Sequence, residues 1–337
     1  MFKIDIHTHI IPKNLNEIIS SFSDERFLSI NFIDDNNAML IKDNQDFRKI
    51  SCNCWHPQER ILECSTTHVD IQVLSTIPAL FSYWAKDSEA LQLSKFLNNH
   101  IHDIVINHNK NFLGLGTVPM QNTDFAISEI DRSINELNFS GIQIGTNING
   151  DNLSEEKFDP IFKFAEEINC SIFVHPWEMM GASELNKYWL PWLVGMPAET
   201  SRAICSLIFG GVLEKYPNLK FAFSHGGGSF PFTLGRINHG YSVRPDLCAI
   251  DNSNLPSEYV GKFYVDSLVH DEDALLFLIN QMGHEKIALG SDYPFPLGEK
   301  HPGQLIEKLN FSDQEKQRML AGTAIEWLGL NEQDYIK

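Results

Sequence analysis

The chain has 337 residues, of which 43% are apolar and 11% are aromatic, so it has enough hydrophobic side chains for a sizeable core and too many for a disordered chain. Lys and Arg number 26 against 44 Asp and Glu, and the resulting formal charge of -18 excludes a nucleic-acid or anionic-membrane surface as the main partner. An anionic ligand would have to be met by local cations or by a metal.

Cysteine usage and the N-terminal stretch indicate the compartment. Six cysteines in a chain of this length are too sparse for a disulfide scaffold, so we expect reduced thiols. Cys52-x-Cys54 lacks the spacing and the second pair of a zinc knuckle. We see no signal-peptide pattern and no run of about 20 apolar residues. These features together predict a cytoplasmic protein.

The first predicted element is a strand over residues 3–6 that leads into His7-Thr8-His9. Side chains alternate across a strand, so Asp5, His7 and His9 would share one face while the isoleucines between them pack on the other. Two histidines in this spacing are equally compatible with a metal site and with ordinary hydrogen-bonded or solvated imidazoles. The rest of the chain has to decide between these interpretations.

Residues 13–56 differ from the rest because they are polar, rich in Asn and Asp, and without sustained helical periodicity. We expect a small inserted lobe with short strands near 27–33 and 38–41, separated by a turn at 34–37.

From residue 57 onward, amphipathic helical stretches alternate with short apolar runs. The predicted strands, with 3–6, are 71–75, 112–118, 141–145, 171–174, 219–224, 262–266 and 286–289. Helical patterns cover 89–107, 125–137, 158–168, 198–216 and 273–282. This alternation implies parallel strands, and eight units predict one closed (β/α)8 barrel of the TIM type over residues 1–337. A doubly wound open sheet is the alternative, but no Gly-x-Gly-x-x-Gly follows the first strand.

The active site of such a barrel lies at the carboxyl ends of its strands. Four predicted strands lead into His or Asp, namely His7 and His9, His175, His225, and Asp292. Each alone could be a core histidine or a loop cap, but random polar residues would not gather selectively at strand ends. Nitrogen and oxygen ligands suit Zn²⁺ or a similar ion, which lowers the pKa of water from about 16 to about 7.

These residues resemble the metal-site pattern of the amidohydrolase superfamily. Longer strings extend the resemblance over essentially the whole chain, and they lie at 81–84, 141–145, 189–200, 225–228 and 290–298. The narrower resemblance is to a decarboxylase branch of that superfamily. It implies metal-dependent, oxygen-independent and non-hydrolytic removal of CO₂ from a small dicarboxylate semialdehyde in the kynurenine pathway of tryptophan catabolism, which diverts flux from quinolinate and NAD synthesis.

The resemblance also implies roles for individual residues. One Zn²⁺ per subunit would be held by His7, His9, His175 and Asp292, and His225 would be the unligated acid/base.

Substrate-binding residues are implied in the same way. Arg48 would bind a substrate carboxylate, Trp189 would line the pocket, and Lys42 is a further candidate. Arg236 would reach the neighbouring active site of a homodimer. Two arginines suit a substrate with two carboxylates, although either could instead form a surface ion pair. Glu178 departs from the branch, which has Asp there.

Three other functions remain open from the sequence. The same ligand set hydrolyses amides and lactones in related enzymes, and related decarboxylases act on aromatic acids. A non-catalytic metal-binding or scaffold protein is disfavoured, because every ligand and the candidate base are present.

Overall fold

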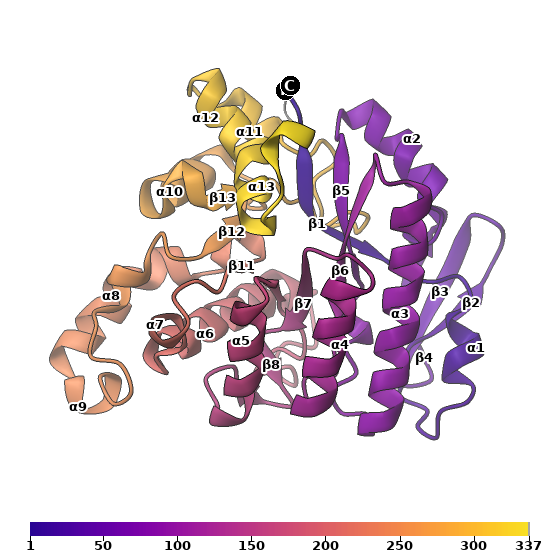
Figure 1. Cartoon of the computed structure of the whole chain (residues 1–337), viewed down its shortest axis with the longest axis horizontal. Helices are drawn as coiled ribbons and strands as arrows, with labels where there is room; N and C mark the ends of the chain where they lie inside the picture. Colours follow the sequence, from indigo (N-terminus) through magenta and orange to yellow (C-terminus); the bar gives the residue numbers. More distant parts are fainter. Residues whose placement is uncertain (336–337) are drawn as a thin grey trace.

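The computed structural model describes residues 1–335, so residues 336–337 of the predicted domain lie outside the described range. Eight parallel strands form the central sheet in the order β1-β5-β6-β7-β10-β11-β12-β13 (Figure 1). Their bounds are Ile4–Ile10, Ile71–Thr76, Phe112–Thr117, Gly141–Gly145, Ser171–His175, Phe221–Phe223, Tyr264–Asp266 and Ile287–Ala288. The backbone N–H of Ile6 donates to the carbonyl of Leu289 at 2.9 Å, and Thr8 forms a parallel bridge with Tyr293. The sheet therefore closes on itself, which confirms the predicted barrel.

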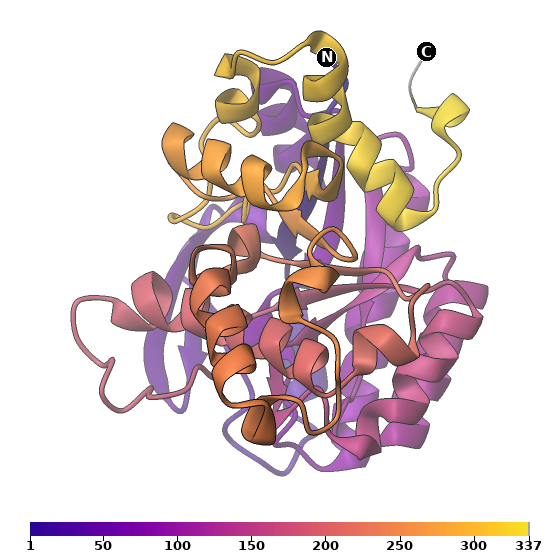
Figure 2. The same cartoon turned by 90° about the vertical axis from the view of Figure 1, so that its left-hand side faces the viewer.

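Helices surround this barrel (Figures 1 and 2). They are α1 Leu15–Ile19, α2 Pro57–Thr67, α3 Asp87–Asn107, α4 Thr123–Asn135, α5 Asp159–Glu167, α6 Met196–Phe209, α7 Val212–Lys215, α8 Phe230–Val243, α9 Pro245–Cys248, α10 Glu272–Met282, α11 Gln304–Lys308, α12 Asp313–Gln317 and α13 Thr323–Leu328. The helix predicted over 198–216 is interrupted, because Gly211 has a φ of 70° and separates α6 from α7. Among residues 1–335, no helix is long and apolar enough to cross a membrane.

One end of the barrel is filled by apolar side chains. Trp327 of α13 is fully buried and packs in a cluster with Ile4, Ile6 and Phe173. Its indole N–H donates to the carbonyl of Lys220 at 3.1 Å, directly before β11 begins. This packing occupies the amino-terminal ends of the strands, so the opposite end is the one available for a functional site.

Strand β1 is longer than predicted. It continues to Ile10, so His7 and His9 lie within the strand rather than after an end at residue 6. Pairing with β5 shifts register between Asp5 and Thr8, and it resumes with His9 opposite Ser75. The longer pairing with β5 supplies the backbone hydrogen bonds that hold both histidines in extended conformation.

A second, three-stranded antiparallel sheet follows α1 and lies beside the barrel next to α3 (Figure 1). Its strands are β2 Ser29–Phe32, β3 Asn37–Lys42 and β4 Gln45–Ser51. Buried Leu40 and Ile50 of this sheet share a hydrophobic cluster with Leu93 and Leu97 of α3. A two-stranded ribbon, β8 Asn147–Ile148 with β9 Asp151–Asn152, completes the strands.

Candidate active site

Three histidines and one aspartate meet at the carboxyl end of the barrel. His7 and His9 come from β1, His175 ends β10, and Asp292 follows β13. One potential ligand atom from each lies within 4.8 Å of every other, and all four residues are buried. The structure thus brings together the four residues that the sequence predicts as metal ligands.

Each of these imidazoles is oriented by a hydrogen bond at Nδ1. His7 Nδ1 lies 2.7 Å from Asp266 Oδ2, His9 Nδ1 lies 3.0 Å from the carbonyl of Thr76, and His175 Nδ1 lies 3.0 Å from the carbonyl of Pro176. Acceptors at Nδ1 place the ring proton there and leave the Nε2 lone pair free. All three Nε2 atoms are buried and lack a hydrogen-bond partner among residues 1–335.

Asp292 adds a negative charge to this group. Its Oδ1 lies 3.2 Å from His9 Nε2 and 3.5 Å from His7 Nε2. Burial alone would raise the pKa of Asp292, but contact with His9 and the neighbouring imidazoles lowers it overall. Three orphaned nitrogens and one carboxylate, buried together, are a donor set that fits a divalent metal such as zinc.

Asp266 is a functional residue that the sequence reasoning missed. Besides facing His7, its carboxylate accepts the backbone N–H groups of His225 at 2.9 Å and Gly226 at 2.8 Å. Burial opposes its ionisation, but the His7 hydrogen bond lowers its pKa overall. Asp266 is the last residue of β12, so its position at a strand end was the available signal.

His225 stands beside the ligand group without joining it. Its ring centroid lies 5.1 Å from that of His7 and 5.2 Å from that of His175. Its φ is 56°, and the backbone hydrogen bonds to Asp266 support this left-handed conformation. Burial lowers the pKa of His225 to about 4, so the ring is neutral at neutral pH.

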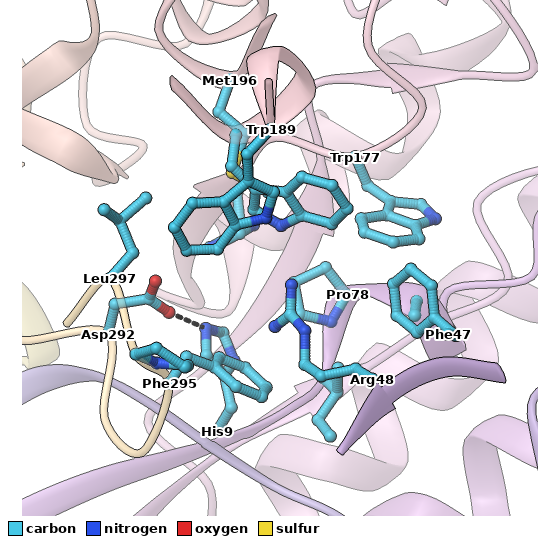
Figure 3. Close-up of a pocket in the computed structure, with 15 residues that line it drawn as sticks. His9, Phe47, Arg48, Pro78, Trp177, Trp189, Met196, Asp292, Phe295 and Leu297 are labelled. Carbon is cyan, nitrogen blue, oxygen red and sulfur yellow. Dashed lines mark ion pairs between the residues drawn. The ribbon is translucent and has the colours of Figure 1, made fainter. Parts of the chain in front are cut away.

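An aromatic pocket opens onto His9, His175 and Asp292 (Figure 3). Its other lining residues are Phe47, Arg48, Ile77, Pro78, Ala79, Trp177, Trp189, Trp192, Met196, Phe295, Pro296 and Leu297. Figure 3 shows Trp189 across the pocket from Arg48, and the dashed line joins His9 and Asp292, whose Nε2 and Oδ1 atoms lie 3.2 Å apart. A bound molecule would therefore contact the proposed ligands, a cation and several aromatic faces at once.

Arg48 reaches the pocket from β4 of the inserted sheet. Its guanidinium carbon lies 4.6 Å from the ring centroid of Phe295, 5.2 Å from that of Trp192 and 5.5 Å from that of Phe47. Burial lowers the pKa of Arg48. A guanidinium held by aromatic faces keeps its N–H donors available for an anion in the pocket.

The remaining predicted residues occupy different places. Trp189 lines the pocket and is 42% exposed. The Nζ of Lys42 lies 5.1 Å from the ring centroid of Trp177, and Lys42 is not one of the residues that line the pocket. Arg236 is exposed on α8 and does not reach the pocket of its own chain. Glu178 is exposed with a φ of 52°, next to Trp177.

The barrel and this site define the class of protein. The chain belongs to the amidohydrolase family, whose model matches residues 4–330. It is 53% identical to the 2-amino-3-carboxymuconate-6-semialdehyde decarboxylase of Dictyostelium discoideum, over 99% of this chain and 93% of that protein. It is 34% identical to the enzyme of the same name from Caenorhabditis elegans, over 98% and 95% of the two chains.

A solved structure shares the fold. The 5-carboxyvanillate decarboxylase of Novosphingobium aromaticivorans, complexed with manganese, superposes with a TM-score of 0.81 at 22% identity, covering 98% of this chain and 96% of that one. Together with the two curated relatives, the family match confirms the predicted class of enzyme, a carbon–carbon lyase of the decarboxylase type.

Proposed function

We propose that this enzyme converts 2-amino-3-carboxymuconate-6-semialdehyde to 2-aminomuconate-6-semialdehyde and CO₂. The observation that carries the proposal is the combination of 53% identity to a decarboxylase of that substrate with an intact group of His7, His9, His175 and Asp292 beside His225. We further propose that the site works in the cytoplasm, in a chain that forms one barrel domain with an insertion at 13–56.

His7, His9, His175 and Asp292 would hold one Zn²⁺. Zinc is our proposal within a broader metal-binding site, since the donor atoms accept other first-row ions and the Novosphingobium aromaticivorans relative is complexed with manganese. When bound, the metal supplies Lewis-acid activation of water and stabilises developing negative charge.

His225 carries the proton in the reaction that we propose. Neutral His225 takes a proton from a water whose oxygen adds to one carbon of the conjugated double bond. It then delivers this proton to the neighbouring carbon, which bears the scissile carboxylate. The electron pair of the breaking C–C bond restores the double bond as CO₂ leaves and the added hydroxyl is expelled, and a proton from solvent converts this hydroxyl back to water. The net change replaces CO₂ by a proton, and neither water nor oxygen is consumed.

Arg48 would hold a carboxylate of the substrate. It is the cation that lines the pocket, and the aromatic rings around it lower the local dielectric, which strengthens a charge-assisted hydrogen bond. Trp189 and the facing aromatic residues would cover the planar conjugated chain and exclude bulk water.

We also propose a homodimer formed through α8 and α9. This region exposes large apolar side chains, with Phe232 82%, Ile250 70%, Leu247 58% and Val243 55% exposed. Such a patch is typical of a protein interface. Arg236 is exposed on the same helix, so a second copy docked there would place it to contribute a cation to the partner's pocket.

The deciding experiment follows the ultraviolet absorbance of freshly generated aminocarboxymuconate semialdehyde while trapped CO₂ is counted, with protein of measured metal content. We expect absorbance loss faster than spontaneous cyclisation and one CO₂ per substrate. His225→Asn serves as the matched control and should retain metal but lose turnover. Metal-loaded protein without acceleration would contradict the proposal and favour aromatic acids, then amides and lactones, as substrates.

A further inference from the structure

Arg60 is a fully buried arginine beside the candidate metal site. It lies on α2, and its solvent exposure is 0%. Its Nη1 donates to the carbonyl of His9 at 2.6 Å and to that of Asn53 at 3.2 Å, and its Nε donates to Gln72 Oε1 at 3.1 Å. These acceptors are all neutral. The second terminal nitrogen, Nη2, has no partner among the residues that the structure describes.

Such an environment is costly for a cation. A buried charge loses several kcal/mol of hydration, and a carboxylate partner normally offsets part of that loss. Arg60 instead donates to neutral acceptors and leaves Nη2 without a partner among the described residues, so no ion pair offsets its desolvation. The desolvation cost of Arg60 points to a role in holding the neighbouring residues in place.

Those neighbours adjoin two of the proposed ligands. The guanidinium carbon of Arg60 lies 4.6 Å from the ring centroid of Tyr293, the residue after Asp292. The hydroxyl of Tyr293 donates to Glu63, which lies one turn along α2 from Arg60. The backbone N–H of His9 donates to the carbonyl of Tyr293 at 2.8 Å. Arg60 therefore contacts the carbonyl of His9 and the ring of Tyr293, and the backbones of these two residues are joined by a hydrogen bond.

We propose that Arg60 is a positioning residue that fixes the separation of His9 and Asp292, and so sets the affinity of the metal centre. The inference rests on the metal site proposed above. The planar guanidinium of Arg60 suits this role. It can donate in its plane to the His9 carbonyl while its carbon lies over the ring of Tyr293. The ammonium of a lysine offers no such plane.

The test uses Arg60→Lys and Arg60→Met in the full-length protein. Apoprotein is prepared with a chelator, and the Kd for Zn²⁺ is measured by competition, alongside the Tm of the apo and zinc-loaded forms. We expect both variants to bind Zn²⁺ roughly 10- to 100-fold more weakly, the usual effect of losing a group that orients a ligand. The loss of Tm should be larger in the zinc-loaded form than in the apo form.

The control is Arg132→Lys, because Arg132 is a partly buried arginine of α4 that pairs with Glu129 away from the metal site. It should lower Tm in both forms equally and leave the zinc Kd unchanged. If Arg60→Lys folds and binds Zn²⁺ as tightly as the unaltered enzyme, the positioning role is overturned while the metal site stands. If the unaltered enzyme itself binds no Zn²⁺, both proposals fail together. Should Arg60→Met not fold, Arg60→Lys alone decides.

Discussion

Asp266 faces His7 at the carboxyl end of the barrel, with 2.7 Å between its Oδ2 and the imidazole Nδ1. The same carboxylate accepts the backbone N–H of His225. One side chain thereby orients a proposed metal ligand and supports the left-handed backbone of the proposed acid/base.

Replacing Asp266 by Asn should weaken this double support. The amide retains one acceptor oxygen but loses the charge that strengthens both hydrogen bonds, so we expect metal affinity to fall roughly 10- to 100-fold. Decarboxylase activity should stay below that of the unaltered enzyme even when the metal content is restored, because His225 is also displaced. Asp70→Asn is the control, since Asp70 lies just before β5 and its carboxylate accepts the backbone N–H of Lys3 rather than a group of the proposed metal site. Equal metal affinity in Asp266→Asn would contradict the assignment.

Arg48→Met should impair substrate binding and leave the metal in place. Loss of a charge-assisted hydrogen bond costs about 1.5–3 kcal/mol, which corresponds to roughly 10- to 100-fold in kcat/KM. Steady-state kinetics with metal analysis would check this. Lys42→Met is the matched control because Lys42 contacts Trp177 but does not line the pocket, so its effect should be small. Comparable losses in both variants would argue for a diffuse electrostatic effect instead of a specific contact.

The proposed dimer predicts complementation between two inactive variants. In a mixed dimer of His225→Asn with Arg236→Ala, one active site carries both defects and the other carries neither. Mixing equal amounts after reversible dissociation should therefore restore about a quarter of the activity of the unaltered enzyme. Sedimentation would establish the dimer. Dimers that exchange subunits without recovering activity would show that Arg236 does not act in the partner's site.

Glu299→Gln should stabilise the enzyme at alkaline pH. Burial raises the pKa of Glu299 from 4.5 to about 7, and its Oε1 has no hydrogen-bond partner within residues 1–335. The folded state thus binds the proton more tightly than the unfolded state, and stability is lost as pH rises from 4.5 to about 7. Above that range, the substitution should gain on the order of 2–3 kcal/mol.

Thermal unfolding of Glu299→Gln at pH 5 and pH 8 would test this predicted pH dependence of stability. The stabilisation should be present at pH 8 and largely absent at pH 5, whereas the exposed control Glu332→Gln should change neither. A gain of equal size at both pH values would mean that the carboxylate is not protonated in the folded state.

Much of this architecture was predictable because parallel strands place their carboxyl ends together. That rule predicts that His7, His9, His175, His225 and Asp292 lie at one end of the barrel, and the family resemblance separates the four ligands from His225. The rule applies equally to Asp266, whose importance nevertheless depends on a contact with His7 that is 259 residues distant in sequence. Nothing local in the sequence indicates such a partner.

Other features escaped prediction for local reasons. Strand β4 reads as polar, with a largely exposed face, and it is held in place by pairing with β3 rather than by its own apolar pattern. The break between α6 and α7 depends on the left-handed conformation of Gly211, which a helical periodicity does not register. The sequence does not single out Arg60, because burial of a charge against carbonyl groups leaves no periodic signal.

The position of β4 separates two tasks along the chain. The proposed metal ligands come from the barrel, whereas Phe47 and Arg48 enter the pocket from the inserted sheet. Changes in the hairpin of β3 and β4 would therefore alter which carboxylic acid fits without touching the machinery that breaks the C–C bond. The barrel would supply the catalytic residues and the inserted sheet would supply substrate selectivity. Exchange of residues 29–51 between relatives is therefore a direct route to a new substrate range.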